Sequence, residues 1–186
     1  CSSDLEGPSA RRNAKMAWDG NKLVLFGGRD FDDAFGDTWS WDANTNTWTA
    51  HPQEDGPTPR FGHSMAFEPM LHDDNASGII LFGGENRGDG RERDPLLGDT
   101  WRWNGESWER HQSHATPSPR AFAALGGYSP SNGVMLYGGI DPNGQKPVDT
   151  WIWNSETNAW HQTGIPGGAH ANRSEEHTSE LQSPCN

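Results

Sequence analysis

The stretch Leu25-Phe26-Gly27-Gly28 decides the fold, because the chain repeats it twice. The copies are Leu81-Phe82-Gly83-Gly84 and Leu136-Tyr137-Gly138-Gly139, so the first glycines stand at 27, 83 and 138, which are 56 and 55 residues apart. Each copy is followed by Asp-Thr-Trp-x-Trp and then by one more tryptophan. A period of about 50 residues is typical of repeat architectures, in which each unit buries its apolar face against its neighbours.

The glycines and tryptophans of the repeat are interpreted as scaffold, because catalytic residues are usually unique whereas scaffold residues recur. We expect the glycine pairs to lie where backbones approach closely or adopt unusual φ angles. The indoles are expected to fill the space between twisted sheets, burying about 150–250 Å² each. The tryptophans in question are Trp39, Trp41, Trp48, Trp101, Trp103, Trp108, Trp151, Trp153 and Trp160.

An aspartate and an arginine also recur once in every unit, and they too are interpreted as scaffold. We expect each aspartate to accept hydrogen bonds from loop amides. Each arginine is expected to tie neighbouring loops together or to pair with a carboxylate. The six residues are Asp37, Asp99, Asp149, Arg11, Arg60 and Arg120.

Each unit is predicted to form four short strands, A to D. Strand B contains apolar runs that indicate burial on both faces, whereas strand C alternates in the manner of a half-buried strand. Strand D surrounds the last tryptophan, after a turn rich in Asn and Gly. Strand A is expected near 11–18, 60–67 and 120–127, strand B near 22–27, 78–83 and 133–138, and strand C near 38–42, 100–104 and 150–154.

Four-stranded meanders of this period, with an apolar-apolar-Gly-Gly segment and a later tryptophan, resemble kelch repeats. The resemblance covers residues 8–163 and departs in one respect, since Trp-x-Trp stands where many kelch repeats have tyrosine. It implies an all-β fold, an incomplete kelch-type β-propeller of three four-stranded antiparallel blades. The expected blades are 8–50, 57–110 and 117–163.

The repeat also predicts what flanks the three blades. Propellers close with about 4–8 blades, so three blades leave sheet faces open. We expect the missing blades of the same propeller as partners. Residues 1–7 are interpreted as the end of a preceding blade or an N-terminal linker, and residues 164–172 as the start of a truncated fourth repeat.

The segment 173–186 shows neither the repeat nor any apolar periodicity. From Arg173 to Ser183 it resembles the translation of a common short-read sequencing adapter, over eleven consecutive positions. The alternative is a natural acidic, disordered tail. We expect an adapter artefact that packs against nothing, and we exclude it from the fold.

Composition excludes some classes of partner. The formal net charge is −12 and no Lys/Arg cluster is present, which argues against binding to nucleic acid. No apolar run approaches the roughly 20 residues of a membrane helix. Cys1 resembles the lipidated first residue of a processed bacterial lipoprotein, with arbitrary fragmentation as the alternative. On this feature we expect an extracytoplasmic or secreted location.

The B–C and D–A connections emerge on the same side of an antiparallel meander, which we call the loop face. The B–C connection 85–98 is the longest, and long loops on a rigid scaffold commonly carry recognition. A solvated surface insertion is the alternative. His63 is distinctive, because alanine stands at its position in the other two units. The candidate binding residues are Glu85, Arg87, Asp89, Arg91, Arg93 and His63.

No catalytic constellation is visible in the sequence, and we predict no catalytic, cofactor-binding or metal-ligating residue. The cluster Asp30, Asp32 and Asp33 lacks the glycine and terminal glutamate of an EF-hand. The favoured function is a binding scaffold that recognises a protein or a glycan through the loop face. The alternative is a fragment of a propeller enzyme, resembling galactose oxidase or a sialic-acid epimerase, whose catalytic residues lie mostly in missing blades.

Overall fold

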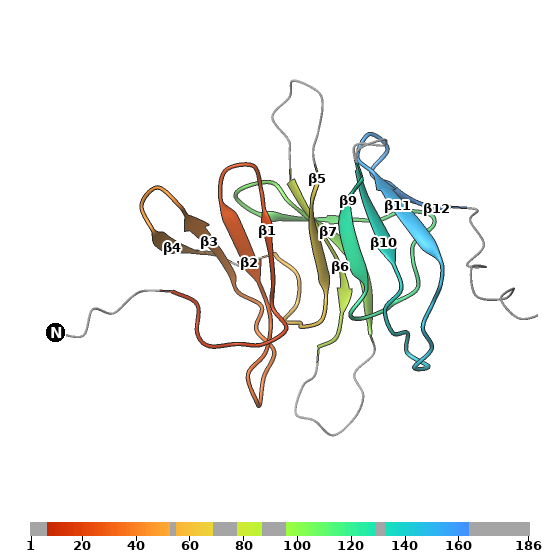
Figure 1. The fold of residues 1–186 in the computed structure, drawn as a ribbon, viewed down its shortest axis with the longest axis horizontal. Coiled ribbons are helices and arrows are strands. Elements are labelled where there is room, and N and C mark those ends of the chain that lie inside the picture. Colours follow the sequence, from red (N-terminus) through yellow and green to blue (C-terminus); the bar gives the residue numbers. More distant parts are fainter. Residues whose placement is uncertain (1–6, 53–54, 69–77, 87–95, 129–132, 164–186) are drawn as a thin grey trace, which may run out of the picture.

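The computed structural model describes residues 7–52, 55–68, 78–86, 96–128 and 133–163. These residues form twelve strands and no helix, arranged as three four-stranded antiparallel sheets (Figure 1). The expected all-β fold of an incomplete kelch-type propeller is therefore confirmed. Cys1, the predicted fourth repeat at 164–172 and the segment 173–186 lie outside the described residues.

Each sheet is a meander whose strands pair in chain order, and we call the three sheets blades 1, 2 and 3. Blade 1 comprises β1 (Lys15–Trp18), β2 (Leu23–Phe26), β3 (Thr38–Asp42) and β4 (Thr47–His51). Blade 2 comprises β5 (Ser64–Glu68), β6 (Gly78–Gly84), β7 (Leu97–Trp103) and β8 (Trp108–His111). Blade 3 comprises β9 (Ala124–Tyr128), β10 (Gly133–Tyr137), β11 (Thr150–Asn154) and β12 (Ala159–Gln162).

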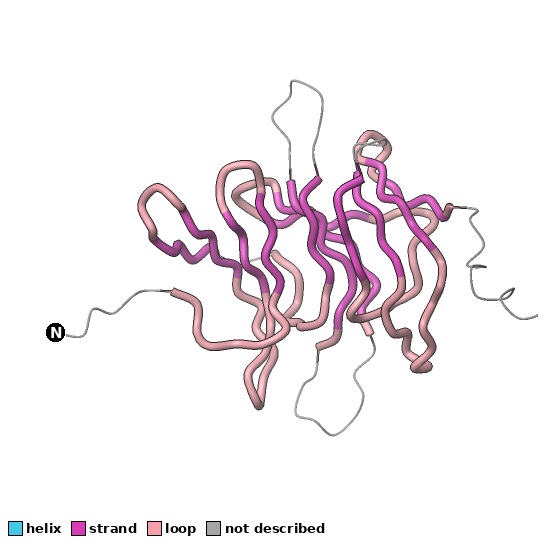
Figure 2. Tube along the Cα trace, in the orientation of Figure 1, coloured by secondary structure: helices cyan, strands magenta, loops and turns pink. Residues whose placement is uncertain are grey.

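The blades follow one another side by side, with blade 2 between blades 1 and 3 (Figure 1). Strands and connecting loops alternate along the part of the chain that the structure describes (Figure 2). No described helix is long and apolar enough to cross a membrane.

The first strand of each blade begins later than the sequence predicts. Strand A was expected from residues 11, 60 and 120, whereas β1, β5 and β9 begin at 15, 64 and 124. The reason is a left-handed backbone at one position of every repeat, with φ of 56° at Asn13, 62° at Gly62 and 58° at Phe122. Such a residue cannot continue an extended strand.

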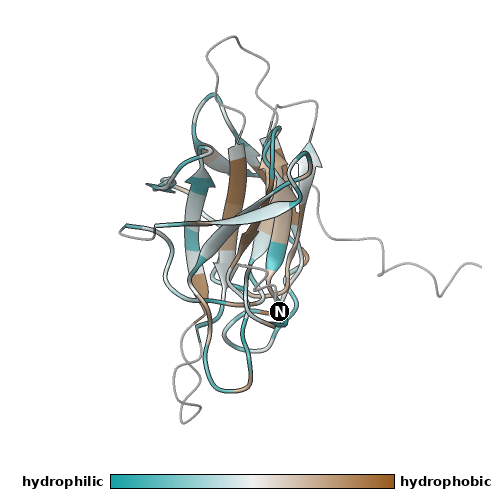
Figure 3. Ribbon diagram, turned by 90° about the vertical axis from the view of Figure 1, so that its left-hand side faces the viewer, coloured by the Kyte–Doolittle hydropathy of each residue, from teal (hydrophilic) through white to brown (hydrophobic). Residues whose placement is uncertain are grey.

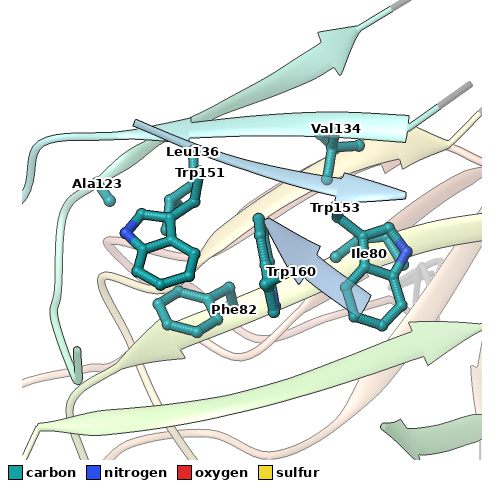
Figure 4. Close-up of a cluster of buried hydrophobic side chains, with 9 residues drawn as sticks. Ile80, Phe82, Ala123, Val134, Leu136, Trp151, Trp153 and Trp160 are labelled. Carbon is teal, nitrogen blue, oxygen red and sulfur yellow. The ribbon is translucent and has the colours of Figure 1, made fainter. Parts of the chain in front are cut away.

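The hydrophobic core lies between the blades. One buried cluster joins Val24 and Phe26 of blade 1 to the leading face of blade 2. The second joins Ile80 and Phe82 of blade 2 to the tryptophans of blade 3 (Figure 4). Apolar residues accordingly concentrate on the strands rather than in the loops (Figure 3). No blade covers its own apolar faces, so each blade depends on its neighbours for burial.

The last tryptophan of each following blade forms the centre of these junctions. The Trp108 ring meets Phe26 edge-on at 5.3 Å, and Trp160 meets Phe82 at 5.5 Å. Both indole nitrogens are satisfied across the junction as well. Trp108 donates to the Thr38 hydroxyl at 2.9 Å, and Trp160 donates to the Thr100 hydroxyl at 2.8 Å. Geometry of this kind combines large apolar burial with a polar contact that sets the register of the blades.

The first glycine of the pair is required in blades 1 and 2 because the next blade lies against it. Gly27 has a φ of +63°, and a Cβ there would stand 2.5 Å from the Arg60 carbonyl oxygen. Gly83 has a φ of +66° and meets the Arg120 carbonyl oxygen in the same way. Gly138 has a φ of +70° but no described atom within 4 Å of its Cβ position. The left-handed backbone of this glycine therefore occurs in all three repeats. Its close contact with an arginine carbonyl of the next blade occurs in the first two.

We predict that Gly83→Ala destabilises the protein more than Gly138→Ala. Both substitutions place alanine in the left-handed region, at a cost of about 1–2 kcal/mol. Only Gly83→Ala also forces a side chain against a neighbouring backbone, which adds about 1–3 kcal/mol. Urea titrations followed by tryptophan fluorescence measure both costs, and equal costs for the two variants would contradict this packing account.

Candidate functional site

The recurrent arginine, aspartate and first tryptophan form one three-residue cluster in each blade. The arginine binds both carboxylate oxygens, with a closest contact of 2.5 Å for Arg11–Asp37, 2.6 Å for Arg60–Asp99 and 2.7 Å for Arg120–Asp149. The indole nitrogens of Trp39, Trp101 and Trp151 donate to the same aspartates at 2.6, 2.7 and 2.7 Å. Guanidinium and indole groups thus replace the loop amides that we expected as the main donors.

The backbone of each following arginine is bound by the preceding blade. The Gly28 amide donates to the Arg60 carbonyl at 2.9 Å, and the Arg60 amide donates to the Phe35 carbonyl at 3.0 Å. The second junction repeats this exchange, with Gly84 to Arg120 at 2.9 Å and Arg120 to Leu97 at 3.1 Å. The arginine is therefore held by two blades at once, and we call this arrangement the inter-blade latch.

The latch aspartates remain ionised, in spite of partial burial. For Asp99, burial raises the pKa, but hydrogen bonds and charge from Arg60, with the Trp101 indole, outweigh it and lower the pKa overall. For Asp149, the hydrogen bond from Arg120 is the largest effect, and the pKa is again lowered. Carboxylates that must stay charged to hold a buried arginine suit a structural role better than proton transfer.

A second buried charge network joins blades 2 and 3, and sequence reasoning did not predict it. Glu68 is fully buried and accepts hydrogen bonds from Arg102 Nε at 2.9 Å, Trp153 Nε1 at 2.7 Å and the Ser155 hydroxyl at 2.5 Å. Its carboxylate is thus satisfied by its own blade and by the next one. The complete set of partners indicates a structural junction.

The predicted binding residues are placed as follows. Glu85 is half-buried directly after β6, where its backbone exchanges two 3.0 Å hydrogen bonds with Phe61, which precedes β5. Arg87, Asp89, Arg91 and Arg93 lie outside the described residues. His63 is 0% exposed and packs against the Phe26 ring at 5.4 Å, so its imidazole does not reach the loop face.

The loop face carries two exposed phenylalanines that sequence reasoning missed. Phe31 is 87% exposed at the tip of the first B–C loop, with the Arg12 guanidinium 5.4 Å from its ring. Phe122 is 49% exposed, and its ring lies over Gly62. The Phe122 amide donates to the Gly62 carbonyl, and the Gly62 amide donates to the Asn13 carbonyl. A row of residues therefore crosses all three blades on this face.

Phe122 is the unusual member of that row. The left-handed conformation is ordinary for Asn13 and Gly62, but it is strained for a bulky aromatic residue. Strained residues persist where the surrounding structure holds them, and they are concentrated at functional sites. A strained phenylalanine that is also half exposed is therefore the strongest candidate for a recognition residue.

The acidic loop 30–33 is organised by its own backbone. The Asp30 carboxylate accepts hydrogen bonds from the amides of Asp32 at 2.9 Å and Asp33 at 2.8 Å, and these bonds lower its pKa. Within the described ranges, no group of three or more His, Cys, Asp or Glu side chains is placed to hold a metal ion.

Comparison with known proteins gives both a motif and relatives. The family described as Kelch motif matches residues 16–52. Over a longer stretch, the chain is 31% identical to the tRNA wybutosine-synthesizing protein 4 of Emericella nidulans, across 157 residues that make up 82% of this chain and 14% of the relative. The Aspergillus fumigatus protein of the same name is 30% identical over 141 residues, or 72% of this chain and 12% of the relative. The chain thus spans a small part of the curated relatives that it matches.

We predict that His63→Ala reduces the dependence of stability on pH. Burial lowers the pKa of His63 from 6.5 to about 3, so the folded ring stays neutral where the unfolded chain takes up a proton. The free energy of unfolding therefore falls as the pH falls from about 6.5 towards 3. His63→Ala removes up to about 1.4 kcal/mol per pH unit of that slope. Urea titrations at several pH values test this, and an unchanged slope would contradict a buried neutral ring.

Proposed function

This chain belongs to the kelch-repeat proteins, and we propose that it is an interaction scaffold which binds a protein partner through its loop face. The observation that carries the proposal is Phe122, which is strained and yet half exposed at the blade 3 end of the row that crosses the three blades. A hydrophobic ring that is half exposed in the monomer gains further free energy when a partner covers it.

The surroundings of Phe122 support a protein as the partner. Phe31 presents a second exposed ring on the same face, with Arg12 beside it and Arg29 stacked on Phe61 at 4.7 Å. Aromatic and arginine side chains are the residue types that dominate binding energy in protein interfaces. The tryptophans, which could stack on sugar rings, are instead largely committed to the junctions between blades.

The backbone that carries the exposed rings is held in place, which suits recognition. Arg29 donates to the backbone carbonyls of Asp30 and Phe31 at 3.1 Å each, which holds the loop that carries Phe31. The Phe122 backbone is bonded to blade 2 through Gly62. Exposed side chains on a fixed backbone lose little conformational entropy on binding. Further blades of the same propeller would extend this surface around a ring.

The relatives suggest a second candidate role. This chain would be the kelch segment of a larger protein that resembles the wybutosine-synthesizing proteins. The net charge of −12 argues that the segment would recruit a protein rather than contact tRNA phosphates. In both roles, the loop face supplies the contact.

We predict that Phe122→Asn weakens partner binding at least tenfold while the fold is kept or stabilised. Asparagine is the residue that blade 1 carries at this position, and it tolerates the left-handed backbone. The experiment selects displayed peptides on the wild-type protein and compares their dissociation constants with those for the variant. Glu106→Ala, in the β7–β8 turn of blade 2 and away from the loop face, is the control and should leave binding unchanged.

Peptides that bind Phe122→Asn as tightly as the wild type would contradict the proposed site. A glycan array tests the alternative, in which the loop face binds a glycan instead of a protein. Glycan binding without any selected peptide would overturn the choice of a protein partner.

A further inference from the structure

We propose that the loop face binds an acidic side chain of its protein partner, and that Arg12 and Arg29 of blade 1 hold the carboxylate. The proposal rests on the loop-face function above and deepens it, because it names the chemistry that a partner must carry. Its basis is that blade 1 places two arginines directly opposite each other beside exposed Phe31, at a position where the other two blades have different residues.

Arg12 and Arg29 form an isolated antiparallel bridge between the segment before β1 and the start of the first B–C connection. Each amide donates to the carbonyl oxygen of the other residue at 2.9 Å, which is the pattern of a hydrogen-bonded antiparallel pair. The side chains of such a pair project to the same side, from Cα atoms about 5.5 Å apart. Two positive charges therefore share one side of the bridge, where like charges repel each other.

The other two blades show that the repeat does not need an arginine at either position. Their equivalent bridges pair Phe61 with Glu85 and Ala121 with Ile140. The backbone therefore forms the same bridge with aromatic, acidic or aliphatic side chains. The two arginines of blade 1 add a repulsion that the bridge does not require, and a ligand carboxylate bound between them would offset it.

Arg29 is fixed in position, and part of its guanidinium remains available. The group stacks on the Phe61 ring of blade 2 at 4.7 Å, and it donates to the carbonyls of Asp30 and Phe31 at 3.1 Å each. Two of the five N–H donors of a guanidinium are used in this way. The other donors have no acceptor among the residues that the structure describes. A stacked planar fork loses little entropy when it binds a carboxylate through parallel hydrogen bonds.

Arg12 completes the pair from the exposed side of the bridge. Its guanidinium lies 5.4 Å from the Phe31 ring. Within the described ranges, no acidic side chain forms an ion pair with Arg12 or with Arg29. The acidic residue next to Arg29 is Asp30, and its carboxylate is bound by two amides of its own loop. No described carboxylate thus contacts the two positive charges directly.

The surroundings favour a single carboxylate over a polyanion. Asp30, Asp32 and Asp33 follow in the same loop, and the formal net charge of the chain is −12. A nucleic acid would bring many phosphates against these charges, whereas one acidic side chain places its charge at the arginines alone. Phe31 and Phe122 offer apolar contacts on the same face. The expected ligand is therefore a peptide segment with one acidic residue beside an apolar residue.

Peptide selection with matched variants tests the proposal. A random peptide library displayed on phage is selected on the wild-type protein. Dissociation constants are then measured for the recovered peptides and for copies in which Asp or Glu becomes Asn or Gln. The recovered peptides should share an acidic residue, and the amide copy should bind the wild type at least tenfold more weakly. On Arg29→Gln, the acidic peptide and its amide copy should bind equally, a coupling that the double-mutant cycle isolates.

Two further variants separate binding from structure. Lys146→Gln is the matched control, because Lys146 is an exposed cation in the blade 3 B–C connection and its loss changes the net charge equally. It should leave the preference for the acidic peptide unchanged. Arg12→Gln should weaken binding of the acidic peptide at least threefold, whereas its urea midpoint should stay unchanged or rise because a repelling charge is removed. A lower midpoint would show a structural pair and would overturn the proposal.

The outcomes separate this proposal from the loop-face function. Recovered peptides without a shared acidic residue, or an acidic preference that survives Arg29→Gln, would contradict the carboxylate site, and the loop-face function would stand if Phe122→Asn still weakened binding. Acidic peptides that need Arg29 but bind Phe122→Asn normally would support the carboxylate site and contradict the role of Phe122. Binding of unfractionated tRNA that is lost in Arg29→Gln, without any selected peptide, would overturn the choice of an acidic protein segment.

Discussion

The rest of the structure depends on an arginine that belongs to two blades at once. The side chains of Arg60 and Arg120 bind the aspartate of their own blade, whereas their backbones exchange hydrogen bonds with the loop of the preceding blade. A buried guanidinium requires a charged partner, and its fixed backbone requires a glycine opposite it. The Arg, Asp and Gly-Gly elements of the repeat therefore form one contact between blades, although they are far apart in the sequence of each unit.

This latch is polar and directional, and it sets where the apolar surfaces meet. The tryptophans then supply most of the buried apolar area between blades. Trp108 and Trp160 each pack edge-on to a phenylalanine of the preceding blade and donate a hydrogen bond to a threonine of that blade. A blade has little core of its own, so stability resides in the junctions. Trp18 and Tyr137 are exposed on the faces of blades 1 and 3 that no described blade covers.

Sequence reasoning succeeded where the chain repeats itself. Gly-Gly, Asp-Thr-Trp-x-Trp and their spacing predicted three four-stranded antiparallel blades, because each element imposes the same local geometry in every copy. It did not identify features that occur in one blade only. Nothing marked Glu68 as the centre of a buried network, since its partners Trp153 and Ser155 lie in another repeat. The late start of β9 was missed because phenylalanine gives no sign of a left-handed backbone at Phe122.

Native-state hydrogen exchange tests the latch most directly. The amides of Gly28 and Gly84 donate to arginine carbonyls of the next blade, whereas Gly139 occupies the same position on the face of blade 3 that no described blade covers. Gly28 and Gly84 should exchange at least tenfold more slowly than Gly139. Equal exchange at the three amides would contradict the claim that the arginine latch joins the blades.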